Sequence, residues 1–143
     1  MKSCLDCGRV LPHAGEVIQE GDHIYFIGIC GTAMASCAGA LKSRGFRVSG
    51  ADANVYPPMS TFLSQAGIKV HEGYDPNHFG EQPDWIVIGN AMSRGNPEVE
   101  YVLEQKWRYC SLPELLKEFF IRGKRSIVVS GTHGKTTTTS MIA

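Results

Sequence analysis

At 143 residues, the chain can form one ordinary hydrophobic core and a fragment of a second. Lysine and arginine balance aspartate and glutamate at 14 each, so the chain lacks the strong basic field of a nucleic-acid-binding protein. No apolar run approaches the roughly 18 residues that cross a bilayer, and we expect neither nucleic acid nor a membrane as a partner.

Residues 1–22 are expected to form a polar leader, because they lack the apolar segment of a secretory signal. Cys4 and Cys7 form a C-x-x-C pair with His13 nearby. A structural zinc site needs four ligands, and no second pair follows. The five cysteines of the chain, an odd number, indicate reduced thiols in a cytoplasmic protein rather than a disulfide framework.

From residue 23 onward, short β-rich apolar runs alternate with helical segments. Strands are expected at 23–29, 46–52, 68–73, 85–90, 108–112 and 125–131. Helices are expected at 32–45, 60–67, 97–106 and 112–123. The first helix should bury Ala33, Met34, Cys37, Ala38 and Leu41, and the second should begin with Ser60 as its N-cap.

This alternation predicts an α/β protein with a Rossmann-like open parallel sheet and helices on both faces, that is, a three-layer α/β/α arrangement. A charged stretch with a glycine at 121–126 marks the expected domain boundary. We therefore expect one domain at 23–122 and the start of another at 123–143.

The first glycine loop, "GICGTAMAS", follows the first strand and opens the first helix, where a doubly wound fold binds a diphosphate on exposed amides. Against the dinucleotide pattern G-x-G-x-x-G it keeps Gly28 but has Cys30 and Ala33 at the other glycine positions, which disfavours an NAD-dependent oxidoreductase. Asp52 follows the second strand, where an acid can bind a ribose hydroxyl. The alternative is that Gly28 and Gly31 only turn the chain and that Asp52 is a solvated loop acid.

The second glycine loop, "GTHGKTT", follows the expected strand at 125–131. Its backbone N–H groups can surround phosphate oxygens, with Lys135 on the β- and γ-phosphates and Thr136 on Mg²⁺. It is shorter than the usual phosphate-loop pattern, and the alternative is a threonine-rich end of the chain.

The two loops, together with "GFRVSGAD", "NVYPPMST" and "GNAMSRGNPEVE", resemble the N-terminal part of the Mur ligase family. These enzymes join amino acids or peptides to UDP-N-acetylmuramic acid. Three stretches, "GICGT" of the first loop, "NVYPPMST" and "GNAMSRGNPEVE", resemble the member that adds the tripeptide L-alanyl-γ-D-glutamyl-meso-diaminopimelate in peptidoglycan recycling. The resemblance implies that ATP phosphorylates the lactyl carboxylate and that the peptide amine then attacks the acyl phosphate. It covers residues 23–143 and implies a UDP-substrate domain followed by the opening of an ATP domain, so we expect a truncated chain that has no activity alone.

The resemblance also implies the roles of individual residues. Lys135 and Thr136 are the expected catalytic residues, with Thr136 as the Mg²⁺ ligand. The expected ATP-binding residues are Gly131, Thr132, His133, Gly134, Lys135, Thr136 and Thr137. The expected UDP-substrate-binding residues are Gly28, Cys30, Gly31, Thr32, Ala33, Asp52, Asn54, Asn90, Ser93 and Arg94.

Two further functions remain open at this point. The family member that adds L-alanine would have the same architecture, although its first loop is usually G-I-G-G-x-G-M. A non-enzymatic nucleotide-binding regulatory module would use the first loop but would not need the second. For Arg94 two readings also stay open: its guanidinium suits a phosphate or carboxylate, and the alternative is a solvated surface residue.

Overall fold

The computed structural model describes residues 19–142, and Cys4, Cys7 and His13 lie outside this range. Its centre is a five-stranded, all-parallel sheet with strand order β3-β2-β1-β4-β5. The strands are β1 (His23–Ile27), β2 (Arg47–Asp52), β3 (Lys69–Glu72), β4 (Trp85–Ile88) and β5 (Tyr109–Ser111).

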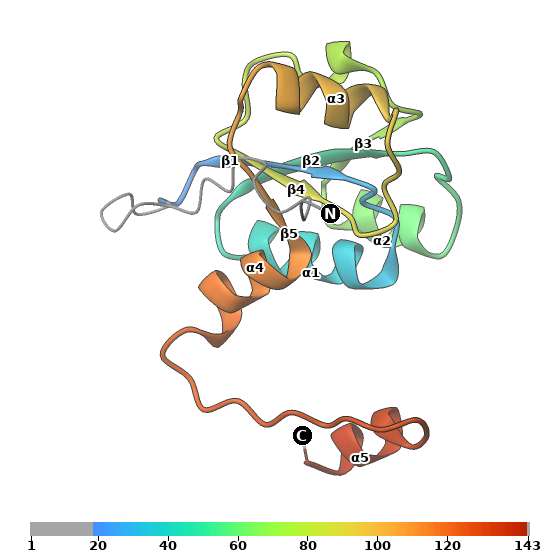
Figure 1. Ribbon diagram of the computed structural model, residues 1–143, viewed down its shortest axis with the longest axis vertical. Helices are drawn as coiled ribbons and strands as arrows, with labels where there is room; N and C mark the ends of the chain where they lie inside the picture. Colours follow the sequence, from blue (N-terminus) through green and yellow to red (C-terminus); the bar gives the residue numbers. More distant parts are fainter. Residues whose placement is uncertain (1–18, 143) are drawn as a thin grey trace, which may run out of the picture.

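Helices cover both faces of this sheet (Figure 1). The helices α1 (Thr32–Lys42), α2 (Met59–Gln65) and α4 (Leu112–Leu116) contribute to the core on one face. The helix α3 (Pro97–Glu104) and the 3-10 turn η1 (Pro76–Phe79) contribute to the core on the other. The expected three-layer, Rossmann-like α/β/α fold is confirmed.

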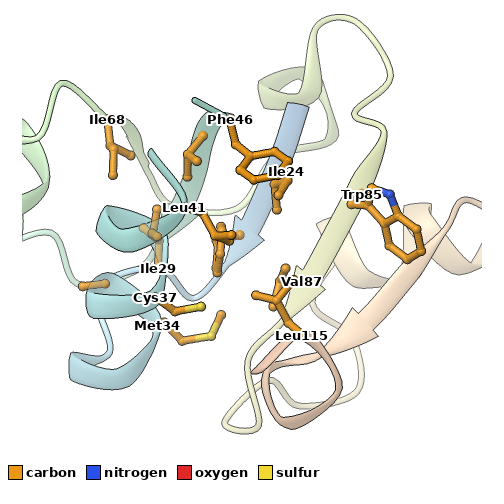
Figure 2. Packing of buried hydrophobic residues seen from close by; sticks show 14 of the residues in the cluster. Ile24, Ile29, Met34, Cys37, Leu41, Phe46, Ile68, Trp85, Val87 and Leu115 are labelled. Carbon is orange, nitrogen blue, oxygen red and sulfur yellow. The ribbon is translucent and has the colours of Figure 1, made fainter. Parts of the chain in front are cut away.

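The central strand β1 carries apolar residues on both faces, as parallel sheets require when helices cover each side. Ile24 and Phe26 pack into the α1 side, and Tyr25 and Ile27 into the α3 side; all four are fully buried. Figure 2 shows the α1 side, where Met34 and Leu41 of the helix meet Ile24, Val87 and Leu115.

The helix boundaries differ from the expected ones in three places. The first helix ends at Lys42; four of the five residues expected on its buried face are buried, and Ala35 takes the place of the exposed Ala33. Pro58, not Ser60, precedes the first residue of α2. The expected helix at 112–123 is α4 followed by a π-helical turn, η2 (Lys117–Ile121).

The expected strand at 125–131 is wrong: the structure has no strand there. Ile127 and Val128 are 65% and 86% exposed. A strand needs a neighbour for its backbone N–H and C=O groups, and the described chain supplies none at this position. Beyond it, every residue of α5 (Lys135–Ile142) is exposed, and the helix lies away from the sheet (Figure 1). The division into domains at residue 122 stays a prediction.

Candidate functional site

The candidate site is a cleft at the carboxyl ends of β1 and β4. The chain leaves β1 through α1 on one face of the sheet and leaves β4 through α3 on the other, so the two strands flank the topological switch point. The cleft has a volume of about 680 Å³, within the usual range of roughly 300–1,000 Å³ for small-molecule sites. Its lining comprises Gly28, Cys30, Gly31, Thr32, Met34, Asp52, Ala53, Asn54, Tyr56, Pro58, Met59, Tyr74, Gly89, Asn90, Ala91, Met92, Ser93 and Asn96.

The glycine loop after β1 is held against the neighbouring strand. Gly28 N–H donates to the carbonyl oxygen of Ala51 at 2.8 Å. Gly28 has φ +87°, and a Cβ at this position would lie 2.9 Å from Met92 Cε. The backbone conformation therefore favours glycine here, and a larger residue would also displace the flexible end of the Met92 side chain.

The loop ends at the N-terminus of α1, which is open toward an acceptor. Gly31 is the N-cap residue and has no side chain to accept from the first-turn N–H groups, and the first turn contains no acidic residue. These N–H groups and the positive end of the helix dipole are suited to an anion such as a phosphate.

Asp52 braces the same loop. Its Oδ2 accepts from Cys30 N–H and its Oδ1 accepts from Asn54 N–H, each at 2.9 Å. Asp52 as a whole is only 9% exposed. It is the one charged residue in the described lining of the cleft. An anion in this cleft would therefore be held by backbone N–H groups rather than by a lining cation.

Cys30 contributes a neutral thiol to the loop. Burial raises the pKa of this thiol above its ordinary value, and the Asp52 carboxylate raises it further. A neutral thiol does not repel a phosphate, so Cys30 is compatible with a diphosphate at this loop.

The opposite wall comes from the connection between β4 and α3. Asn96 is the N-cap of α3, and its Oδ1 accepts from Glu98 N–H at 3.0 Å and from Val99 N–H at 3.2 Å. Its Nδ2 donates to Met92 Sδ at 3.5 Å, which joins two lining residues.

Two tyrosines complete the cleft and were missed by the sequence reasoning. Tyr56, which is 64% exposed, lies between β2 and α2, and Tyr74 follows β3. An aromatic residue shortly after the carboxyl end of an expected strand was the available signal for both.

Eight of the ten residues predicted for the UDP substrate line the cleft: Gly28, Cys30, Gly31, Thr32, Asp52, Asn54, Asn90 and Ser93. Ala33 and Arg94 are exposed and lie outside this lining. The residues come from three connections of the sheet, so the fold brings together what the sequence spreads over 66 positions, from 28 to 93.

The predicted ATP-binding residues form a separate exposed loop before and within α5. Lys135 is the first residue of α5, and its Nζ donates back to the carbonyl oxygens of Gly131 and Thr132. Gly134 has φ +76°. This loop with a lysine folded over it fits a phosphate-binding role, although its side chains contact no other element in the described interactions.

Residues 19–142 contain neither a metal-binding cluster of side chains nor a helix that could span a membrane. No group of three or more His, Cys, Asp or Glu side chains there is arranged to hold a metal ion. Residues 19–142 also contain no helix of the length and apolarity that a membrane span requires.

Comparison with known proteins gives a family match over most of the chain. The model described as "Mur ligase family, catalytic domain" matches residues 23–124. The chain is 51% identical over 120 residues to the UDP-N-acetylmuramate--L-alanyl-gamma-D-glutamyl-meso-2,6-diaminoheptandioate ligase of Haemophilus influenzae, covering 84% of this chain and 26% of that protein. It is 38% identical over 128 residues to the UDP-N-acetylmuramate--L-alanine ligase of Lactobacillus johnsonii, covering 89% and 29%.

A solved structure of a murein peptide ligase agrees with the sequence comparison. The murein peptide ligase of Psychrobacter arcticus superimposes with a TM-score of 0.81 at 50% sequence identity, covering 85% of this chain and 25% of that one. The chain thus spans about a quarter of the length of the curated relatives it matches.

Proposed function

Because the chain belongs to the Mur ligase family, we propose that residues 23–122 bind UDP-N-acetylmuramic acid for an ATP-dependent, amide-forming ligase. The amino substrate is the tripeptide L-alanyl-γ-D-glutamyl-meso-diaminopimelate, and the process is peptidoglycan recycling in the cytoplasm. The higher identity to the tripeptide ligase than to the L-alanine ligase, 51% against 38%, supports this choice of substrate.

The observation that carries the proposal is the cleft at the switch point between β1 and β4. Its glycine loop and the open N-terminus of α1 offer N–H groups to the diphosphate. Asn90 and Ser93 offer hydrogen bonds to the sugar from the opposite wall, and Tyr56 offers an exposed ring to the uracil.

ATP and Mg²⁺ belong to the second glycine loop in this proposal. Lys135 would neutralise phosphate charge, the N–H groups of residues 132–136 would orient the phosphates, and Thr136 would contact Mg²⁺. When bound, ATP would supply the phosphoryl group that activates the carboxylate of the sugar substrate.

Calorimetric titration of the 143-residue chain with UDP-N-acetylmuramic acid, UDP and NAD tests the first loop. We expect the two uridine ligands to bind, with little change when ATP is added, and NAD not to bind. Backbone amide shifts should move at residues 28–33. Absence of heat and of shifts at those residues with millimolar UDP-N-acetylmuramic acid would refute the proposal.

A matched pair of variants tests the aromatic part of the cleft. Tyr56 and Phe62 are both exposed aromatic residues between β2 and β3, but only Tyr56 lines the cleft. Tyr56→Ala should lower the affinity for UDP by about tenfold, as loss of base stacking does elsewhere. Phe62→Ala should leave that affinity unchanged, and an equal loss in both variants would place the uracil elsewhere.

A further inference from the structure

Glu98 is a fully buried acidic residue that the cleft lining does not include. It is the second residue of α3 and is 0% exposed. A carboxyl group is rarely fully buried unless its oxygens have partners, so its position needs a physical reason.

Three donors from two different parts of the chain converge on one oxygen of this side chain. Glu98 Oε1 accepts from Tyr25 Oη at 3.0 Å and from Asp75 N–H at 3.2 Å, and His78 Nδ1 lies 3.1 Å away. Tyr25 belongs to β1, whereas Asp75 and His78 belong to the connection between β3 and β4. Glu98 therefore joins the central strand, this connection and the start of α3.

The second oxygen contributes nothing to this network. Glu98 Oε2 is buried without a hydrogen-bond partner in the described chain. Burial also raises the pKa of the Glu98 carboxyl, although the three donors oppose the shift. Burial of an unsatisfied oxygen is costly, so the arrangement depends on what Oε1 holds.

Glu98 contacts the supports of two cleft walls, one through Oε1 and the other through its backbone N–H. Tyr74, which lines the cleft, is the residue directly before Asp75, whose N–H bonds to Glu98. Asn96, on another wall, accepts from Glu98 N–H and in turn contacts Met92. Glu98 thus links the backbone beside Tyr74, through its side chain, to Asn96, through its own N–H.

We propose that Glu98 is a positioning residue of the cleft: Oε1 sets the separation between the Tyr74 wall and the Asn96 wall. It touches no ligand itself. This inference rests on the proposed function only for the identity of the ligand that the cleft binds.

Three variants separate positioning from general stability. Glu98→Gln keeps an acceptor oxygen for the three donors, whereas Glu98→Met removes it at similar length. Val102→Ala is the control, because Val102 is a fully buried residue of the same helix that lies outside the cleft lining. For each variant we would measure the melting temperature, the affinity for UDP by calorimetry and the amide shifts of residues 74 and 96 without ligand.

We expect Glu98→Met to lower the UDP affinity about tenfold and Glu98→Gln to stay within about threefold of wild type. Val102→Ala should lower the melting temperature but leave the affinity within about twofold. The amide signals of Tyr74 and Asn96 should move in Glu98→Met and not in Val102→Ala. Affinity retained in Glu98→Met, or lost equally in Val102→Ala, overturns the proposal.

Two further outcomes are also decisive. If the wild-type chain does not bind UDP, the proposed function fails, and the amide shifts of residues 74 and 96 alone decide the positioning role. If Glu98→Met does not fold, His78→Leu takes its place, because it removes one of the three donors to Oε1. The His78 side chain is 22% exposed, so its replacement disturbs the core less than a change at the buried Glu98. A loss of UDP affinity of about threefold or more is then expected, and a smaller loss overturns the proposal.

Discussion

Replacing Asp52 with alanine distinguishes a residue that braces the glycine loop from one that only binds a ribose. The substitution removes the acceptors of two backbone N–H groups, those of Cys30 and Asn54, each at 2.9 Å. Cys30 is partly buried, so loss of its bond to a charged group should cost about 1.5–3 kcal/mol. Asn54 is exposed and water replaces its partner, which adds only about 0.5 kcal/mol.

The expected loss for Asp52→Ala is therefore about 2–3.5 kcal/mol in the free energy of unfolding. For a folded domain of this size that corresponds to a melting temperature roughly 10–15 °C lower. Urea unfolding followed by the fluorescence of the buried Trp85 and by circular dichroism measures it.

Asp84→Ala is the matched control. Asp84 is exposed, and its Oδ2 accepts from His23 N–H at 2.7 Å at the other end of β1. Because water can replace this exposed carboxylate, the loss should be about 1 kcal/mol or less. An Asp52→Ala variant as stable as wild type but weaker in UDP binding would refute the bracing role and favour a ribose ligand.

Three further predictions concern the sheet, the buried acid and the second loop. Gly50→Ala should lower the free energy of unfolding in urea by about 3 kcal/mol, because the added Cβ would overlap the Phe26 carbonyl oxygen. Gly73→Ala is the control: Gly73 has φ +81° but open space around its Cβ position, so the loss should be only about 1 kcal/mol. Because folding raises the pKa of Glu98, the unfolded chain loses this proton at a lower pH than the folded chain. The stability of the wild type relative to Glu98→Gln should therefore fall as the pH rises from 4.5 through the folded-state pKa. A stability difference that does not change with pH would show that the carboxyl is not desolvated. Lys135→Ala should leave the melting temperature unchanged, because the exposed Lys135 contacts only its own loop. For the same reason, the 143-residue chain should release no phosphate from ATP in the presence of UDP-N-acetylmuramic acid and tripeptide. Phosphate release in a malachite green assay would contradict this second prediction.

Local patterns in the sequence were sufficient for the fold class and for one side of the cleft. The apolar run of β1, the glycines after it and the apolar face of α1 are features of neighbouring residues, and strand-loop-helix order alone places a phosphate at such a loop. The same local reasoning failed at 125–131, because β-propensity does not provide a pairing partner.

The opposite wall depended on contacts between distant residues. Residue 28 meets residue 92 because β4 pairs with β1 although α1, β2, α2 and β3 intervene in the chain. Periodicity does not encode that pairing, and so Met92 was not predicted, although Asn90 and Ser93 of the same connection were.

Glu98 shows the division most clearly. In the sequence it reads as an ordinary acid in the first turn of a helix, favoured there by the helix dipole. Only the tertiary structure buries it completely and brings Tyr25, Asp75 and His78 to the same oxygen. Local residue order determined most of the elements and the glycine loop after β1, whereas the position of each cleft wall was decided by non-local packing, because burial and hydrogen-bond partners exist only once the strands have paired.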